Sequence, residues 1–388
     1  MKYFSYLNSA AAIISSYQGQ QPFHVFLKSF FKANKKYGSR DRKEIAQVCY
    51  HYFRLGVWTK GKPLADAIAM AQFLCASEPQ PLLAAINEEW NRNAGLSLAE
   101  KCAMLQINID ALQIFPPVAV LSQGIQPSVF NLSHLVQPAV FLRVRPGRQE
   151  QVAEKLNAAG IPFKQIAAHC ISVPAASKID TVLAIDKEVV VQDHSSQRTG
   201  ELLQLVPNKT TLRVWDCCAA SGGKSLLAWD MLGAIDLTVS DIRPAVLEKL
   251  QLRLAMAGIH PFHLHTADLT RPVPAALQQS FDLIIADAPC TGSGTWGRTP
   301  ERLSFFNKKE IDKYVQLQQQ IVSNVLPCLR AGGYFLYITC SVFKRENEDM
   351  VSFIEAKGAH CLSMQLFTGY DHRADTLFAA MFEVKSKQ

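Results

Sequence analysis

The sequence predicts an α/β protein whose main part is a doubly wound, mostly parallel sheet, preceded by a small α/β unit and an all-helical amino-terminal domain. From residue 195 onward, short apolar strands alternate with helices, which is the pattern of doubly wound sheets. Before residue 130, apolar residues recur at the three- and four-residue spacing of helices. A chain of 388 residues has room for two or three domains. We expect them at residues 1–130, 131–194 and 195–388.

The composition excludes several classes of protein. Apolar residues make up 48% and charged residues 19%, which is ordinary for a globular chain. No apolar run approaches the roughly 18 residues of a membrane span, and the first residues lack the apolar block of a signal peptide. The ten cysteines show no CxxC pair, so neither a disulfide scaffold nor a zinc site is indicated. We expect a cytoplasmic protein without a membrane segment or a bound metal.

The amino-terminal domain carries the positive charge of the chain. The net charge of the whole chain is +7, but residues 1–63 hold eleven Lys or Arg against only Asp41 and Glu44. Residues 38–56 (GSRDRKEIAQVCYHYFRLG) predict one capped amphipathic helix. A basic segment rich in aromatic residues suits binding to a polyanion such as RNA. The charge alone fits equally well a helical bundle whose solvated face is basic.

The small α/β unit is predicted from short strands around one helix. PAVFLRVRP at 138–146 predicts a strand, and RQEQVAEKLNAAG at 148–160 predicts a helix that ends at a glycine. Further short strands are predicted at 161–166, 169–174 and 188–193.

The main sheet follows in regular order. Strands are predicted at 211–216, 237–242, 262–268, 281–287 and 334–341, with helices starting near 223, 244, 308 and 346. Residues 362–367 and 377–385 predict two further strands, which we expect at the edges of the sheet. In such sheets a ligand binds beyond the carboxyl ends of the strands.

Polar residues gather where these strands end, and they indicate a nucleoside ligand. Gly222 and Gly223 allow a tight turn into a helix whose amino end faces a ligand. The pair lacks the spacing of a dinucleotide loop or a P-loop, and a plain strand-to-helix turn is the alternative. Asp241, Asp268 and Asp287 end or closely follow successive strands, where carboxylates accept hydrogen bonds from a ribose. Without a phosphate-binding loop, S-adenosylmethionine is the better candidate ligand.

Two cysteines stand at the same rim. Cys290 follows the fourth strand and Cys340 follows the fifth, so both thiols are expected beside the cofactor. A thiolate that attacks carbon 6 of cytosine makes carbon 5 nucleophilic, and carbon 5 then accepts a methyl group before a base removes its proton. Two thiols and an Asp suit this chemistry.

Several of these segments resemble the motifs of a known family. DCCAASGGK (216–224), DAPCTGSG (287–294) with RTPE (298–301), GGYFLYITCS (332–341) and ENED (346–349) occur in the order found in the Sun/Fmu, or RsmB-type, RNA (cytosine-5) methyltransferases. VQDHSSQ (191–197) and DTLFAAMF (375–382) resemble segments that open and close that family's catalytic domain. The resemblance covers roughly residues 138–388.

The resemblance implies roles for particular residues. Cys340 would be the nucleophile, and Cys290 would assist proton removal and product release, with Asp287 and Lys224 in the same active site. S-adenosylmethionine would be bound by Cys218, Ala219, Ala220, Ser221, Gly222, Gly223, Lys224, Asp241, Arg243, Asp268 and Asp287.

The resemblance also concerns the RNA. The amino-terminal helices resemble, more faintly, the NusB-like RNA-binding domain of such enzymes, and Arg143 and Arg298 would contact RNA. The family usually has Pro where this chain has Ser221, Asn where it has Arg145 and Arg where it has Gly297. We expect Arg145 and Gly297 on RNA-facing surfaces, so these departures concern the substrate more than the chemistry.

The leading hypothesis is an enzyme, acting as a monomer, that forms 5-methylcytosine in 16S ribosomal RNA of the small subunit. Its cofactor would be S-adenosylmethionine, and no metal is required. Two alternatives remain: a transfer RNA cytosine-5 methyltransferase with the same core, and an RNA-binding ribosome-assembly factor with incidental methylation.

Overall fold

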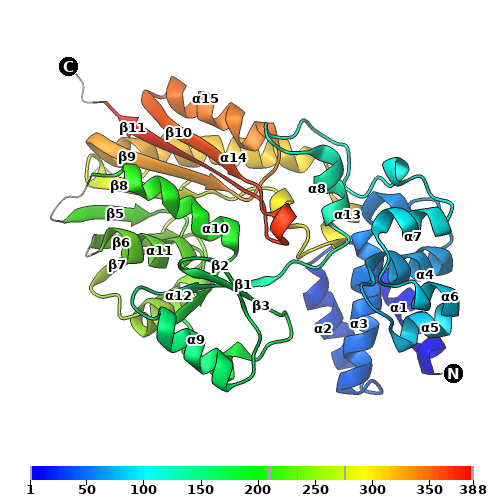
Figure 1. Cartoon of the computed structure of the whole chain (residues 1–388). Helices are drawn as coiled ribbons and strands as arrows, with labels where there is room; N and C mark the ends of the chain where they lie inside the picture. Colours follow the sequence, from blue (N-terminus) through cyan, green and yellow to red (C-terminus); the bar gives the residue numbers. More distant parts are fainter. Residues whose placement is uncertain (1, 208–210, 234, 275–276, 386–388) are drawn as a thin grey trace. The chain divides into compact units, whose positions relative to one another are not determined.

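The computed structural model describes residues 2–207, 211–233, 235–274 and 277–385. The chain divides into two compact units (Figure 1). The first comprises residues 1–119, 126–137 and 295–308, and the second comprises residues 120–125, 138–294 and 309–388. Each unit is described by itself.

The first unit is helical. The predicted helix at 38–56 is confirmed as α3, and the side chain of Asp41 accepts a hydrogen bond of 3.2 Å from the amide of Gly38 at its start. Its core is aromatic, with Phe23 and Phe53 fully buried and in edge contact. The described helices are α1 (Lys2–Ser16), α2 (Phe23–Ala33), α3 (Ser39–Arg54), α4 (Leu64–Cys75), α5 (Pro81–Ile86), α6 (Glu88–Arg92), α7 (Leu98–Met104), α8 (Pro127–Ser133) and α13 (Glu301–Phe305).

Helix α13 belongs to this unit although the sequence assigns residues 295–308 to the catalytic domain. The buried Glu301 accepts a hydrogen bond of 3.1 Å from the amide of Phe23. The buried Arg54 donates to the carbonyls of Gly297 and His134, at 3.0 Å each. Buried polar groups need such partners, and these contacts hold the inserted segment against the amino-terminal helices.

The second unit contains two sheets. The smaller is antiparallel and has the order β2-β3-β1-β4. Its elements are β1 (Val140–Val144), α9 (Gln149–Ala158), β2 (Lys164–Ala167), β3 (Cys170–Val173) and β4 (Val189–Val191). The sequence treats this region as a separate domain. In the structure it keeps its own sheet and core but packs within the same compact unit as the main sheet.

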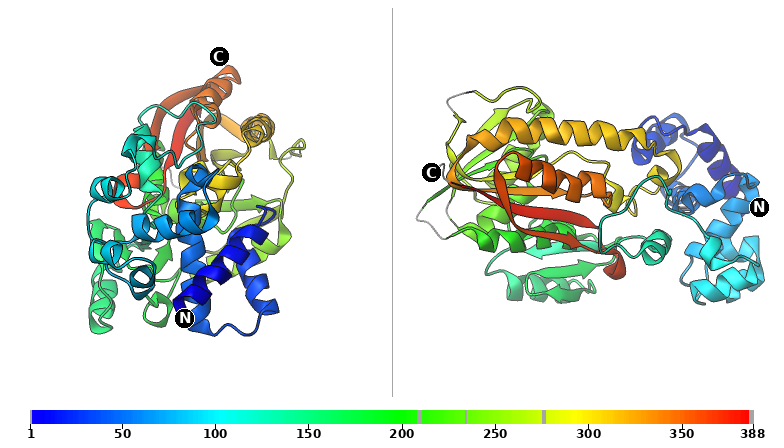
Figure 2. Two further views of the ribbon diagram at one scale, coloured as in Figure 1. Left: turned by 90° about the vertical axis from the view of Figure 1, so that its right-hand side faces the viewer. Right: turned by 90° about the horizontal axis from the view of Figure 1, so that it is seen from above.

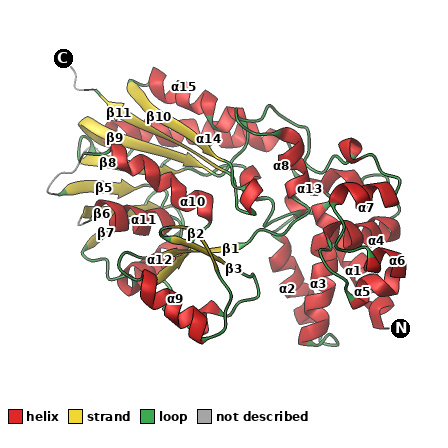
Figure 3. Cartoon of the chain, viewed as in Figure 1, coloured by secondary structure: helices red, strands yellow, loops and turns green. Residues whose placement is uncertain are grey.

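The main sheet has seven strands in the order β10-β11-β9-β8-β5-β6-β7 (Figure 3). Its strands are β5 (Leu212–Asp216), β6 (Ile235–Asp241), β7 (Phe262–Thr266), β8 (Phe281–Asp287), β9 (Leu329–Thr339), β10 (Ala359–Phe367) and β11 (Leu377–Val384). The first five of these pair in parallel, and β11 pairs antiparallel with both β9 and β10.

The position of β11 corrects one expectation. Of these two strands, β10 lies at an edge of the sheet, but β11 is inserted between β10 and β9. Residues 377–382 of β11 are all buried, whereas the interior of β10 alternates mostly between exposed and partly buried positions. A continuous apolar run is typical of a strand covered on both faces, and this difference in pattern distinguishes the two strands.

Helices cover both faces of the main sheet (Figure 2). They are α10 (His194–Arg198), α11 (Gly223–Leu232), α12 (Pro244–Met256), α14 (Lys309–Val325) and α15 (Glu348–Ala356). Because the strand order reverses between β5 and β8, right-handed crossovers place α11 and α12 on one face and α14 and α15 on the other. The carboxyl ends of β5, β6, β8 and β9 therefore meet at one rim. Among the described helices, none is both long and apolar enough to cross a membrane.

Candidate active site

The cysteine pair lies at this rim. Strands β8 and β9 are parallel neighbours, with Asp287 opposite Ile338, and Cys290 and Cys340 follow their ends. The two Sγ atoms are 3.3 Å apart, so the prediction that the thiols lie together is confirmed. The hydrogen bond to Cys340, burial and the charge of Glu346 together raise the pKa of Cys290 well above its ordinary value.

The buried carboxylate of Glu346 is hydrogen-bonded to both cysteine loops, which are the loop after β8 that carries Cys290 and the loop after β9 that carries Cys340. Its oxygens accept hydrogen bonds from the amide and hydroxyl of Thr291, at 2.9 and 2.6 Å, and from the hydroxyl of Ser341 at 2.5 Å. The amide of Gln318 donates to Glu346 at 3.2 Å and to the carbonyl of Pro289 at 3.0 Å. Burial raises the pKa of Glu346, and the hydroxyl donors oppose that rise. Thr291 and Ser341 are each adjacent to a cysteine, so Glu346 fixes the spacing of the pair.

The backbone adds a second connection at Gly294. Its amide donates to the carbonyl of Cys340, and its carbonyl accepts from the amide of Thr376, both at 2.9 Å. A Cβ on Gly294 would lie 2.0 Å from the carbonyl oxygen of Thr376, which is closer than any real contact. Only glycine allows this close approach of three chain segments.

Lys224 connects the first helix of the sheet to the strand that carries Cys290. Its Nζ lies 2.9 Å from a carboxylate oxygen of Asp287 and 2.8 Å from the hydroxyl of Ser196 on α10. The Lys224 side chain is 8% exposed and that of Asp287 is 34% exposed, so the carboxylate remains accessible from the rim. Sequence reasoning did not identify Ser196, although it lies in the quoted segment VQDHSSQ.

The glycine loop between β5 and α11 has a strained backbone. Ala220 has a φ of 44° and Gly222 a φ of 83°, and a Cβ on Gly222 would lie 2.1 Å from Leu250 Cδ1. A non-glycine residue in this region carries a cost of about 1 kcal/mol or more. The amide of Ala220 donates to Asp241 at 3.1 Å, which ties the loop to the end of β6.

Asp241 ends β6, and both of its carboxylate oxygens accept hydrogen bonds. Arg243 donates to both of its oxygens, at 2.9 and 3.0 Å. Burial pushes the pKa of Asp241 upward, but the hydrogen bonds and charge of Arg243 outweigh it and hold the pKa below its ordinary value. The Arg243 side chain is 60% exposed and free of the core. The neighbouring Ile242 is 57% exposed and offers an apolar wall at the same edge.

Asp216, at the end of β5, was not assigned a role from the sequence. One oxygen accepts a hydrogen bond from Ser225, whereas its Oδ1 is buried without a partner among the described residues. Burial raises the pKa of Asp216 to about 7. An unsatisfied buried acceptor beneath the glycine loop is a feature that a bound ligand would complete.

The remaining predicted cofactor residues line the same loop, with one exception. Asp268 lies beyond β7, where its carboxylate accepts hydrogen bonds from the amide and hydroxyl of Thr270. The others form the turn from β5 into α11: Cys218, Ala219, Ala220, Ser221, Gly222, Gly223 and Lys224. No group of three or more His, Cys, Asp or Glu residues in the described part of the chain is placed to hold a metal ion.

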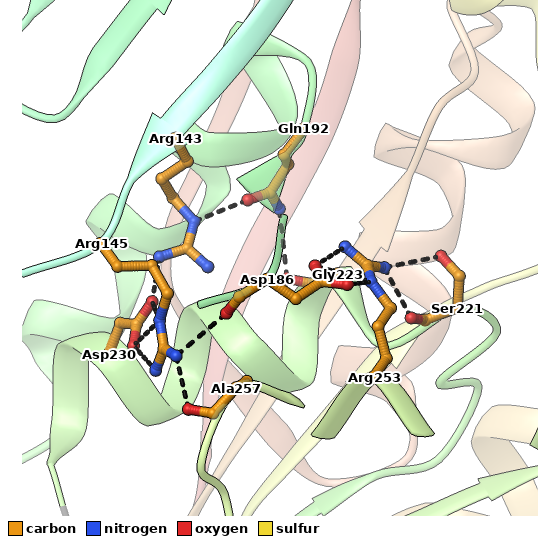
Figure 4. Close-up of polar contacts among 9 residues, drawn as sticks. All are labelled: Arg143, Arg145, Asp186, Gln192, Ser221, Gly223, Asp230, Arg253 and Ala257. Carbon is orange, nitrogen blue, oxygen red and sulfur yellow. Dashed lines mark hydrogen bonds and ion pairs between the residues drawn. The ribbon is translucent and has the colours of Figure 1, made fainter. Parts of the chain in front are cut away.

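The structure corrects the expected positions of two arginines (Figure 4). Arg143 is 5% exposed; it pairs with Asp230 on α11 and donates to Gln192 at 2.8 Å. Arg145 also pairs with Asp230, at 2.7 Å, and is 12% exposed. Alternation along β1 and its antiparallel neighbours turns these side chains toward α11 instead of toward solvent. Neither arginine presents the exposed surface that contact with RNA requires, whereas Arg298, in the helical unit, is exposed.

The strand order and the ligand rim define the class of protein as one with a Rossmann-like methyltransferase fold. A solved structure titled as a methyltransferase homolog from Pyrococcus horikoshii aligns with a TM-score of 0.57 and 22% identity, over 68% of this chain and 92% of that one. NSun6 from the same organism, solved with SFG, aligns with a TM-score of 0.59 and 15% identity, over 71% of this chain and all of that one. These likenesses concern the fold.

Sequence comparison finds a family match for part of the chain. Residues 201–374 match the model of the family described as 16S rRNA methyltransferase RsmB/F. A relative from Xanthomonas campestris pv. campestris, named ribosomal RNA small subunit methyltransferase B, is 31% identical over 218 residues, which are 54% of this chain and 49% of that protein. The chain spans about half the length of this curated relative.

Proposed function

We propose that this protein uses S-adenosylmethionine to methylate carbon 5 of a cytosine in 16S ribosomal RNA. The observation that carries the proposal is the pair of thiols 3.3 Å apart at the rim that also carries Asp241 and Asp287. The match of residues 201–374 to the RsmB/F family model supports both the reaction and the RNA class.

The residues of the site divide the chemistry between them. Cys340, as a thiolate, adds to carbon 6 of the ring, and the electron pair moves so that carbon 5 becomes nucleophilic. S-adenosylmethionine supplies an electrophilic methyl group. Cys290 assists removal of the carbon 5 proton, after which the bond to Cys340 breaks and the thiolate is restored. The net change replaces hydrogen by methyl and releases one proton.

The polar groups around the thiols suit this assignment. Lys224 holds the Asp287 carboxylate at 2.9 Å, and that carboxylate can accept a hydrogen bond from the amino group of cytosine. The Sγ atoms of Cys290 and Cys340 lie 3.3 Å apart, so both thiols can act on the same pyrimidine ring.

The cofactor site also fits its ligand. Asp241 accepts hydrogen bonds at the end of β6, as a ribose requires, and Ile242 provides an apolar surface beside it. The amino end of the ten-residue helix α11 follows the glycine loop. The unpartnered Oδ1 of Asp216 remains as an acceptor for a ligand donor.

A methyl-transfer assay tests the proposal directly. Wild type, Cys340→Ala and Cys290→Ala would be offered naked 16S ribosomal RNA, assembled small subunits and bulk transfer RNA with labelled cofactor. We expect label in 5-methylcytosine from ribosomal RNA, no transfer by Cys340→Ala, and an accumulating protein–RNA adduct with Cys290→Ala. Undiminished turnover by Cys340→Ala would overturn the assignment of the nucleophile.

The same assay separates the two alternatives. Label confined to transfer RNA would keep the chemistry and change the substrate. No label in any pool, together with tight binding to ribosomal RNA, would favour an assembly factor whose basic amino-terminal segment holds RNA.

A further inference from the structure

The glycine loop is supported from the side of the small sheet. Its backbone has positive φ at Ala220 and Gly222, which is strained at Ala220 and allowed at glycine, and Ser221 between them is exposed. Serine does not restrict φ as proline does, so the residue itself does not fix the loop. Strained loops keep their shape only where surrounding contacts determine it.

The first of these contacts comes from Arg253 on α12. Its Nη1 donates to the carbonyl of Ser221 at 2.7 Å and lies 3.3 Å from the Ser221 hydroxyl. The Nε of the same guanidinium donates to both carboxylate oxygens of Asp186, at 2.9 and 2.8 Å (Figure 4). Asp186 is 5% exposed and precedes β4 of the small sheet. Arg253 is therefore held on one side and holds the loop on the other.

The second contact comes from Gln192, at the end of β4. Its Oε1 accepts from Arg143 at 2.8 Å, and its Nε2 lies 3.3 Å from the carbonyl of Gly223 and 3.4 Å from the hydroxyl of Ser196. Ser196 in turn contacts Lys224, the partner of Asp287. A continuous series of polar contacts thus joins the small sheet to the catalytic carboxylate.

Both contacts start from ion pairs that are shielded from water. Asp230 is 5% exposed and pairs with Arg143 and Arg145, and the Asp186 side chain is 7% exposed. Pairs with so little exposure are weakly screened, and a planar guanidinium can hold two partners in fixed directions at once. The position of the loop is therefore coupled to the position of the small sheet.

We propose that Arg253 and Gln192 are positioning residues for the cofactor, through which the small sheet holds the glycine loop in the shape that binds S-adenosylmethionine. This inference rests on the proposed function, because it assumes that the loop binds that cofactor. The proposal gives the small sheet a role in cofactor affinity, whereas the sequence predicts that its Arg143 contacts RNA.

The test compares three proteins by calorimetric titration with S-adenosylhomocysteine, the demethylated cofactor product. Arg253→Lys keeps a charge that can pair with Asp186 but cannot also reach Ser221 in the fork geometry of arginine. Arg213→Lys is the matched control, because Arg213 pairs with Asp236 at the opposite, amino ends of β5 and β6. We expect Kd to rise at least fivefold in Arg253→Lys and to stay unchanged in Arg213→Lys.

Two further measurements distinguish positioning from loss of folding. Amide hydrogen exchange at residues 219–223 should become faster in Arg253→Lys while the thermal midpoint stays close to that of wild type. In turnover, the KM for S-adenosylmethionine should rise while kcat is retained, because Arg253 does not touch the reacting atoms.

Gln192→Leu provides a second, independent variant, with an expected twofold to threefold rise in Kd because its contact to Gly223 is longer. Wild-type affinity in both variants would overturn the inference while leaving the proposed function intact. If wild type itself does not bind S-adenosylhomocysteine, the cofactor assignment fails first and the inference with it.

Discussion

Two buried carboxylates lie under the two halves of the site, and they differ in how well they are satisfied. Glu346, beneath the cysteine loops, accepts hydrogen bonds from Thr291, Ser341 and Gln318. Asp216, beneath the glycine loop, accepts from Ser225 and has one oxygen without a partner among the described residues. Glu346 is thus satisfied by the protein alone, whereas Asp216 keeps an open position for a ligand.

The largest effect is expected from Glu346→Gln. The substitution keeps the size of the side chain but leaves buried donors of Thr291 or Ser341 without an acceptor, which costs about 2–4 kcal/mol. Displacing reacting groups by about 1 Å lowers turnover roughly 100-fold, so we expect kcat to fall by about that factor while cofactor affinity stays near that of wild type. Denaturation, turnover and titration measure the three quantities. Equal losses in kcat and cofactor affinity would contradict the separation of the two halves.

A pH-dependent effect on stability is expected from Asp216→Asn. Because the pKa of Asp216 rises from 3.8 to about 7 on folding, the folded state favours its protonated form. Its contribution to stability is therefore fully present below about pH 4 and is lost as the pH rises to about 7. The asparagine variant should lose this dependence and gain up to about 4 kcal/mol over wild type at pH 8, on the order of the full shift.

The free energy of unfolding, measured from pH 4.5 to 8 for both proteins, checks this prediction. Saturating S-adenosylhomocysteine should narrow the difference in the free energy of unfolding between wild type and Asp216→Asn, because the ligand supplies the missing partner of the Asp216 carboxylate. Parallel pH curves for wild type and Asp216→Asn would show that Asp216 does not titrate in this range.

The smallest effect is expected at the surface beside Glu346. Arg345 pairs with Asp312, and their side chains are 48% and 56% exposed. Exposed pairs contribute about 0–1 kcal/mol, so Arg345→Ala should leave turnover unchanged and alter the free energy of unfolding by less than about 0.5 kcal/mol. A large loss of turnover or stability in Arg345→Ala would mean that any substitution in the segment around residue 346 disturbs the site. The effect of Glu346→Gln could then not be ascribed to its carboxylate.

Much of this arrangement could be predicted from the sequence because it depends on local pattern. The alternation of strands and helices after residue 195 predicts the parallel part of the sheet, and strand ends predict the meeting of Cys290 with Cys340. The positions of β11 and α13 could not be predicted, since they depend on pairing between segments distant in sequence. The ion pairs of Arg143 and Arg145 with Asp230 are equally non-local, and an arginine in a strand does not show from its neighbours which face has a buried acid.

The polar residues that were missed illustrate the same limit. Asp216, Ser196 and Glu346 all lie within quoted motifs, so a signal for their importance was present. Their roles were not visible, because a carboxylate in a motif looks the same whether it contacts a ligand or supports a loop. Only the hydrogen-bond donors that the structure places around each oxygen distinguish Glu346 from Asp216.

The close approach at Gly294 has a consequence for the order of events during synthesis. The loop of Cys290, the loop of Cys340 and Thr376 meet there, and Thr376 directly precedes β11, the last of the described strands in the chain. A ribosome that has released only the first 370 residues therefore holds a nascent chain with both thiols but without Thr376, whose amide bonds the Gly294 carbonyl. On the proposed function, we expect the growing polypeptide to gain reactivity toward RNA only after the hairpin of β10 and β11 has emerged.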